Sequence, residues 1–149
     1  MKISAKDEYA CSAVLELALH YDPDTPIRVQ DIAESQKIPA KFLFQIMQIL
    51  RRVEIVRSKR GTDGGYVLAR PPEQITVGEV IRSVSGPFVQ LSCLDSGNFD
   101  DDCDRESTCQ FKPIWAEVDR NISSVLNSIT FAALVKKVQA KDPQVMYHI

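Results

Sequence analysis

Three cysteines in the second half of the chain have the type and spacing of metal ligands. Cys93, Cys103 and Cys109 follow the pattern Cys-x9-Cys-x5-Cys in one expected loop, whose polar, acidic part spans about residues 92–108. Thiolates bind soft metal centres such as an iron–sulfur cluster or zinc. Three thiolates leave either centre one ligand short. The spacing alone therefore does not decide whether the cysteines hold an iron–sulfur cluster, hold structural zinc or act as a thiol switch.

A second group of residues has the character of a DNA contact. Lys59 and Arg60 lead into the glycine-rich stretch 61–65, with a short apolar strand expected on either side. Glycine permits the positive φ of a hairpin turn and a close backbone approach to phosphate. Arg60 at the tip is suited to a narrow minor groove, where negative potential is concentrated. The alternative is a hairpin that only aids solubility; DNA contact is favoured because the local charge and the preceding helix agree with it.

Two short helices are expected just before this hairpin. They span about residues 29–35 and 40–50, and the turn 36–39 joins them, with Pro39 suited to a first helical turn. Helix, turn, helix and a two-stranded wing make a winged helix-turn-helix, which reads DNA. The second helix has a predicted buried stripe, which consists of Phe42, Leu43, Ile46, Met47, Ile49 and Leu50. Its outer residues are then Ala40, Lys41, Phe44, Gln45 and Gln48.

The outer face of the second helix is expected to meet base edges in the major groove. Lys41 and Gln45 are one turn apart, so both side chains can point there. Glutamine can bond an adenine edge and lysine can reach guanine or phosphate. An ordinary solvated helix face is the alternative, and the adjacent wing favours DNA. The predicted DNA contacts are Ala40, Lys41, Phe42, Gln45, Arg51, Lys59, Arg60, Gly64, Gly65 and Tyr66.

The charge distribution agrees with this interpretation, although the formal net charge is −2. Residues 1–36 carry 3 basic and 7 acidic side chains, and residues 71–149 carry 7 basic and 11 acidic side chains. Residues 37–70 instead carry 8 basic and 2 acidic side chains, a local net charge of +6. Phosphate binding depends on the local field and not on the charge of the whole protein.

The remaining elements are expected to be helical. Ser4 and Asp7 form a capping signal for a first helix, whose apolar face would bury Cys11 as a small hydrophobe. Thr76 and Glu79 form a second capping signal, and Ile27 with Val29 suggests a strand beside the wing. A long helix from Pro113 has an apolar stripe consisting of Ile114, Trp115, Val118, Ile122, Val125, Leu126 and Ile129.

No second long helix is available to cover that stripe, so pairing with a second copy of the chain is favoured over packing back on the small domain. The predicted fold is mainly α with a small β-wing: a winged helix-turn-helix domain plus a long dimerisation helix. The predicted regions are a DNA-binding domain (1–86), a cysteine-bearing loop (87–112), a dimerisation helix region (113–135) and a flexible tail (136–149).

Other classes of protein find little support. The chain has no signal peptide and no apolar run of membrane-spanning length, so we expect a cytoplasmic protein. It has no nucleophile–base pair or acid pair, and the glycines at 61–65 lack the strand-to-helix context of a nucleotide site. An enzyme is therefore not expected.

Several segments together share the pattern of one family of regulators. They are Met-Lys-Ile-Ser-x-Lys at the start, Asp31-Ile32-Ala33-Glu34, Phe42-Leu43-x-Gln45, Arg60-Gly61-x-x-Gly64-Gly65-Tyr66-x-Leu68, Ile75-x-Val77-Gly78-Glu79-Val80-Ile81, the three cysteines, and Asn127-x-Ile129-x-x-x-x-Leu134-Val135. Through them the chain resembles, over nearly its whole length, the IscR/NsrR/RirA/CymR superfamily of bacterial winged-helix repressors. The resemblance implies a homodimer on a palindromic operator, with an iron–sulfur cluster, 2Fe-2S or 4Fe-4S, that reports iron, redox or nitric oxide status.

The resemblance also implies a fourth ligand. In IscR-like members a histidine three residues after the last cysteine completes the site, but Lys112 stands there in this chain. NsrR-like members use a carboxylate near the start of the first helix of the other subunit, and that position matches Glu8, beside Asp7. The predicted ligands are therefore Cys93, Cys103, Cys109 and Glu8, with Glu8 as an ordinary helix-start acid as the alternative. At the recognition helix, Phe44 replaces a base-selecting glutamate of IscR-like proteins.

The CymR-like branch implies a different signal. There the regulator responds to a partner protein, a cysteine-biosynthesis enzyme. Control by such a partner, by zinc or by thiol oxidation without any cluster is therefore the alternative to iron–sulfur sensing.

Overall fold

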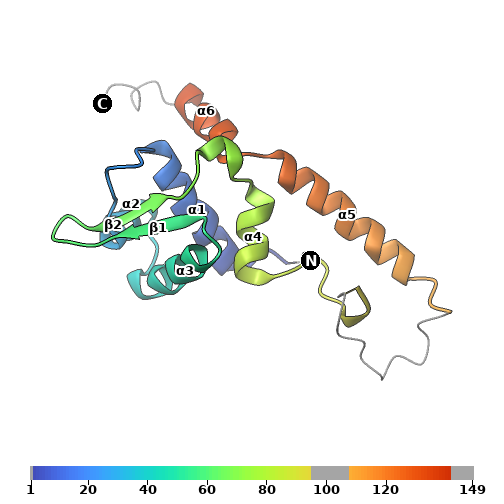
Figure 1. Ribbon diagram of the computed structural model, residues 1–149. Helices are drawn as coiled ribbons and strands as arrows, with labels where there is room; N and C mark the ends of the chain where they lie inside the picture. The colour runs from blue at the N-terminus through green and yellow to red at the C-terminus, as the bar shows by residue number, and fades with distance from the viewer. Residues whose placement is uncertain (1, 95–107, 142–149) are drawn as a thin grey trace.

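The computed structural model describes residues 2–94 and 108–141 and is mainly α-helical with one small antiparallel sheet (Figure 1). The predicted fold class, a winged helix-turn-helix with a long additional helix, is confirmed. The elements are α1 (Ala5–Leu19), α2 (Val29–Gln36), α3 (Ala40–Arg52), β1 (Val56–Lys59), β2 (Gly65–Leu68), η1 (Pro72–Gln74), α4 (Val77–Ser85), η2 (Ser92–Leu94), α5 (Lys112–Ser128) and α6 (Phe131–Lys141).

Helix α1 forms the centre of the fold. Its first turn is closed by the predicted capping box, in which the Asp7 N–H donates to Ser4 Oγ at 3.2 Å and the Ser4 N–H donates to Asp7 Oδ2 at 2.8 Å. Its buried residues include Ala10, Val14 and Leu17. Helices α2, α3, α4 and α6 and strand β2 all pack against it. Burial of this one helix from several sides therefore holds the DNA-reading elements together.

The helix-turn-helix is formed by α2 and α3. Lys37 ends α2 in the left-handed region, with φ 54°, and Ile38 is buried in the turn that follows. The predicted buried stripe of α3 is correct for Leu43, Ile46, Met47 and Leu50, and Ile49 is half-buried.

Phe42 was wrongly assigned to that stripe, because its side chain is 57% exposed. At about 100° per residue it lies between the buried Ile46 and the half-buried Ile49 around the helix axis, but in the first turn of α3. An apolar side chain at the end of a helix can remain in solvent although its face is buried farther along.

The wing is the hairpin of β1 and β2, paired in the register Val56↔Leu68 to Lys59↔Gly65. The predicted strand of Ile27 and Val29 is wrong: Ile27 forms only a single bridge with Tyr66, and Val29 is the first residue of α2. The Ile27 N–H donates to Tyr66 O at 2.9 Å, and the Tyr66 N–H donates to Ile27 O at 2.8 Å. The chain turns into a helix directly after this bridge, so no strand can extend.

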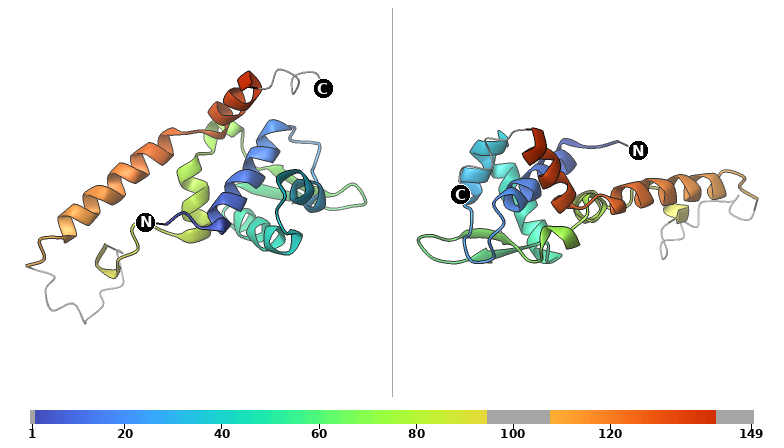
Figure 2. Two further views of the ribbon diagram at one scale, coloured as in Figure 1. Left: turned by 180° about the vertical axis from the view of Figure 1, so that it is seen from behind. Right: turned by 90° about the horizontal axis from the view of Figure 1, so that it is seen from above.

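Helix α5 projects away from the core, opposite to the wing (Figure 2). It contains no buried residue, and its main neighbours are α4 and η2. At its carboxyl end the chain returns to the core, where the Val77 N–H donates to Ile129 O at 2.9 Å and Phe131 is fully buried. The predicted helix from Pro113 is confirmed, with Pro113 in its first turn.

Helix α6 extends into the segment that was expected to be a flexible tail. The tail was predicted from Lys136 onward, but α6 continues to Lys141. Phe131 anchors its first turn, and Leu134 and Val135 pack on the core. These contacts stabilise the lysine-rich second half, which has no strong apolar pattern of its own.

Candidate nucleic-acid interface and cysteine site

The amino-terminal half of α3 presents a polar and aromatic surface. Lys41 and Gln45 are exposed one turn apart, as predicted, and Ala40 is exposed beside them. Phe44 is 54% exposed on the same helix. The opposite face is fixed by the buried Leu43, Ile46, Met47 and Leu50, which hold α3 against the core. These outward side chains are therefore free to meet another molecule.

The wing is braced near its tip, where it also carries an exposed cation. Lys59 is half-buried, and its Nζ donates to the Asp24 carbonyl oxygen at 3.1 Å and lies 3.4 Å from Asp24 Oδ1. Arg28 Nη2 donates to Thr62 O at 2.9 Å. Arg60 is exposed. Lys59 is therefore engaged with the segment before α2, while Arg60 is the tip residue best placed to reach a phosphate or a groove.

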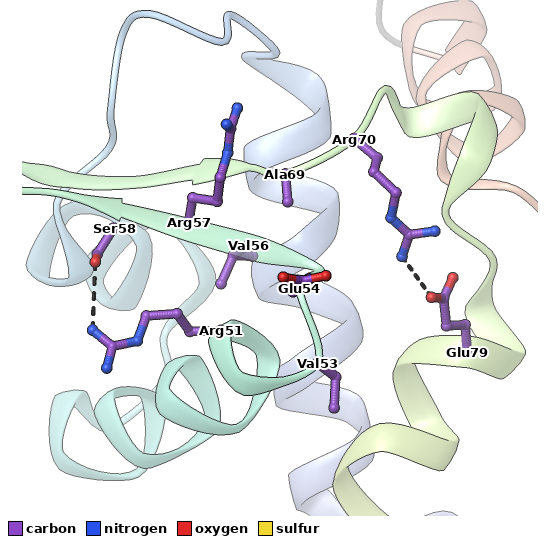
Figure 3. Close-up of a pocket in the computed structure, with 9 residues that line it drawn as sticks. All are labelled: Arg51, Val53, Glu54, Val56, Arg57, Ser58, Ala69, Arg70 and Glu79. Atoms are coloured by element: carbon purple, nitrogen blue, oxygen red, sulfur yellow. Dashed lines mark hydrogen bonds and ion pairs between the residues drawn. The ribbon is translucent and has the colours of Figure 1, made fainter.

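A hollow of about 780 Å³ separates the end of α3 from the wing and α4 (Figure 3). Within it Arg51 turns toward the wing, with Nη1 3.5 Å from Ser58 Oγ, while Arg57 points to the other face of the strand. Arg70 is paired with Glu79 at 2.5 Å. Arg51 and Ser58 thus form a polar junction between the recognition helix and the wing.

Tyr66 differs from the other predicted contacts. It is 6% exposed and belongs to the hydrophobic core, so its side chain does not reach the surface where DNA would lie. Gly64 and Gly65 are half-buried at the start of β2, close to backbone atoms of Lys59 and Ile27. These three residues shape the wing and do not present side chains from it.

Ser58 is a candidate interface residue that the sequence did not predict. Arg57 and Ser58 are both exposed on β1, but only Ser58 faces Arg51, while Arg57 points to the other face of the strand. Alternation along the strand is the signal that would have separated them, because successive side chains of a strand point to opposite faces. The contact with Arg51 cannot be read from the strand alone, since it depends on the angle between α3 and the wing.

The described cysteines of the metal motif lie at both ends of the predicted loop. Cys93 is in η2, and Cys109 precedes α5; both are half-buried and neither forms a disulfide. Helix η2 lies beside α5, and the Val89 N–H donates to Asp119 Oδ1 of α5 at 3.1 Å. Cys103 lies outside the described residues. Thus α5 anchors the chain on both sides of the segment that carries the thiols.

Thiolates of this kind suit an iron–sulfur cluster or zinc. Within residues 2–94 and 108–141, no three side chains of the types Cys, His, Asp and Glu are grouped as a metal site. A complete ligand set therefore requires Cys103 and a further donor. The predicted donor, Glu8, is exposed on α1, whereas its neighbour Asp7 is buried and engaged with Ser4. Of these two acids, only Glu8 has a carboxylate that is free to serve as a metal ligand.

Cys11 is a structural residue, as predicted. It packs against the hydrophobic core. Burial, and secondarily the negative charge of Asp7, raise the pKa of its thiol to about 11. A thiol with that pKa is almost wholly protonated at neutral pH, so it is a poor nucleophile and a poor metal ligand.

No helix within the described ranges is both long and apolar enough to cross a membrane. The family described as "Rrf2: Iron-dependent Transcriptional regulator" matches residues 3–137. The chain is 36% identical over 135 residues to the "HTH-type transcriptional regulator IscR" of Yersinia pestis, covering 91% of this chain and 79% of that protein.

Two solved structures resemble the chain as a whole. "T. potens IscR" has a TM-score of 0.74 and 32% identity, with 95% of this chain and 91% of that chain covered. CymR, "the Global Cysteine Regulator of B. subtilis", has a TM-score of 0.71 and 28% identity, with 92% and 98% covered.

Proposed function

Since the chain belongs to the Rrf2 family of DNA-binding transcriptional regulators, a family without enzymes, we propose that it acts as a homodimeric repressor on a palindromic operator. The N-terminal half of α3 would lie in the major groove, with Lys41 and Gln45 on base edges, and Arg60 would enter the minor groove. The genes we propose as targets serve iron–sulfur assembly or iron homeostasis.

The observation that carries the proposal is the position of the positive charge. Residues 37–70, which include α3 and the wing, carry a net charge of +6 in a chain of net charge −2. Lys41, Arg51, Arg52 and Arg60 are all exposed there. A surface of this sign attracts a phosphate backbone, and the exposed side chains of α3 can then read base edges.

Dimerisation through α5 is supported by its uncovered apolar face. Ile114 is 50% exposed, Trp115 42% and Val125 60%. Trp115 and Val118 also line a hollow of about 580 Å³ together with Ile3, which precedes α1, and Phe88, which follows α4. Exposed apolar surface of this extent marks an interface. A second copy related by two-fold symmetry would cover it and would place two copies of α3 on successive half-sites.

For the cofactor we propose Cys93, Cys103 and Cys109 of one chain with Glu8 of a second copy as the ligands. A bound iron–sulfur cluster would supply a centre sensitive to iron, redox state or nitric oxide. In this proposal the bound cluster would hold η2 and the residues before α5 against α5. That contact would fix the spacing of the two copies of α3. A coupling of about 1–3 kcal/mol would change operator affinity roughly 5- to 150-fold.

The test is purification without oxygen, followed by iron and sulfide analysis and genome-wide footprinting with and without the bound metal. We expect a dimer that contains iron and sulfide and that protects palindromic sites. Arg60→Ala should weaken binding, Lys41→Ala and Gln45→Ala should alter the preferred sequence, and affinity should fall steeply with salt. Absence of protected sites in every oxidation state would refute the DNA-binding proposal.

The fourth ligand has its own test. Glu8→Gln should reduce the iron content of the purified dimer without changing its stability, because Glu8 is exposed. Glu73→Gln is the matched control, since Glu73 is an exposed acid in η1. Equal iron content in both variants would remove Glu8 from the ligand set.

Control without a cluster is the second candidate, and the overall similarity to CymR supports it. In that case zinc, thiol oxidation or a partner protein such as a cysteine-biosynthesis enzyme would set operator affinity. Colourless protein with full operator affinity and no iron would favour this candidate. Zinc analysis then tests control by zinc, a Cys93→Ser/Cys103→Ser variant tests control by thiol oxidation, and a pull-down tests control by a partner protein.

A further inference from the structure

The recognition helix exposes two large apolar side chains where a soluble surface normally has polar ones. Phe42 is 57% and Phe44 54% exposed, although the same helix buries Leu43, Ile46, Met47 and Leu50. Neither ring has a place in the hydrophobic core. Exposed aromatic rings beside lysine and glutamine indicate a surface that becomes covered when the helix meets its target.

The two rings occupy different positions around the axis of α3. At about 100° per residue, Phe44 lies roughly 60° from Lys41 and 40° from Gln48, on the polar outer face. Phe42 lies roughly 100° from Lys41 on the other side, at the border of the buried stripe next to Ile46. Phe44 is therefore within the surface that a duplex would cover, and Phe42 is at its edge.

A phenyl ring has no hydrogen-bond donor or acceptor to offer a base edge. In the major groove the one apolar feature that distinguishes a base is the C5 methyl group of thymine, and phenylalanine is one of the side chains that contact it. The local net charge of +6 in residues 37–70 attracts the phosphate backbone. The Phe44 ring would then lie close to the base edges in the groove.

We propose that Phe44 is a specificity-determining residue that selects thymine by packing on its C5 methyl group. The inference rests on the proposed DNA-binding function and adds to it the base at one position of each half-site. Gln45 and Lys41 would read neighbouring bases by hydrogen bonds, and Phe44 would supply the apolar part of the same surface.

The experiment uses the full-length protein and the operator found by footprinting. Each thymine is replaced in turn by deoxyuridine, which removes the methyl group and leaves base pairing unchanged, and Kd is measured at fixed salt. The wild-type protein should bind about fourfold more weakly at one thymine per half-site, the effect expected for one methyl-sized group. Phe44→Ala should bind the unmodified operator correspondingly more weakly and should not respond to uracil at that position.

Phe42→Ala is the matched control, because it removes the same ring from the same helix at nearly equal exposure. It should retain the uracil effect, and Phe44→Leu should retain part of it, since leucine can still contact a methyl group. An unchanged melting temperature in all three variants shows that they fold.

Three outcomes would overturn the proposal. The first is a wild-type protein that responds to no uracil, and the second is a Phe44→Ala variant with an unchanged uracil effect. The third is failure to bind any operator, which would refute the proposed function together with this inference. Sequence-specific binding without a methyl effect refutes the inference alone.

Discussion

Gly78 of α4 lies directly against the side chain of Asn127 in α5. A β-carbon at position 78 would stand 2.3 Å from Asn127 Oδ1 and 3.1 Å from its Cγ. Arg82, about one turn farther along α4, donates from Nη2 to the same Oδ1 at 2.7 Å. The close approach at Gly78 and the Arg82 hydrogen bond together fix the carboxyl end of α5 on the DNA-binding domain.

Gly78→Ala should therefore force α4 and α5 apart. We expect the free energy of unfolding to fall by about 1–3 kcal/mol, the usual cost of overpacking. We also expect weaker operator binding, because in the proposed dimer α5 would set the relation between the two copies of α3. Urea unfolding and gel-shift titration measure the two effects.

A second substitution tests the cause. In Gly78→Ala/Asn127→Ala the amide that meets the new methyl group is removed, so much of the lost stability should return. A Gly78→Ala protein with wild-type stability and affinity would show that this contact does not position α5.

The amino-terminal cap of α1 predicts a pH dependence of stability. Although burial raises the pKa of Asp7, hydrogen bonds from the side chain and the backbone N–H of Ser4 outweigh it and hold the pKa below its ordinary value of 3.8. A depressed pKa stabilises the folded state above about pH 4, and this contribution is lost as the pH falls through the folded-state pKa. Asp7→Ala should cost about 1 kcal/mol at pH 7 and progressively less below pH 4.

Unfolding free energies of wild type and Asp7→Ala at pH 7 and pH 3 give the comparison. Asp31→Ala serves as the control, because Asp31 is an exposed acid in the first turn of α2. A penalty for Asp7→Ala that stays constant over this range would contradict the role assigned to its carboxylate.

The cysteines should differ in reactivity. With a pKa of about 11, Cys11 has only about one thiolate in a thousand at pH 8. Native protein without metal, treated with iodoacetamide at pH 8, should be alkylated at Cys93 and Cys109 well before Cys11, as peptide mass spectrometry would show. In denaturant Cys11 should react as fast as the others. Early alkylation of Cys11 in the native protein would contradict its burial.

Gly65 is predicted to be indispensable for the wing. A β-carbon there would lie 2.3 Å from Ile27 O, the acceptor of the Tyr66 N–H. Gly65→Ala should break the Ile27–Tyr66 bridge, destabilise the protein by about 1–3 kcal/mol and weaken operator binding. Gly61→Ala is a useful comparison, because position 61 has no atom within 4 Å and only a φ of +122° to strain. If Gly65→Ala is the milder of the two, the close packing of Gly65 on Ile27 is not the constraint.

Much of the fold follows from local signals in the sequence. The capping pairs Ser4–Asp7 and Thr76–Glu79 place the starts of α1 and α4, and Pro113 lies in the first turn of α5. The errors fall where tertiary contacts decide. Ile27 pairs for one residue only because α2 begins immediately afterwards, and α6 extends because Phe131 anchors it in the core.

The candidate sites could be predicted only in part. Lys41, Gln45 and Arg60 are exposed as expected, since helical spacing and a hairpin tip determine this locally. Tyr66 could not be excluded from the sequence, because its burial depends on the core beneath the wing. The proposed fourth metal ligand, Glu8 of a second copy, would also have no fixed spacing from the cysteines, so only the family resemblance suggests it.

The wing is not an independent hairpin, because the stretch between α1 and α2 braces it. Asp24 accepts from Lys59, Arg28 donates to Thr62, and Ile27 pairs with Tyr66. A change in the length of residues 20–26 would therefore alter the pitch of the hairpin without touching a base.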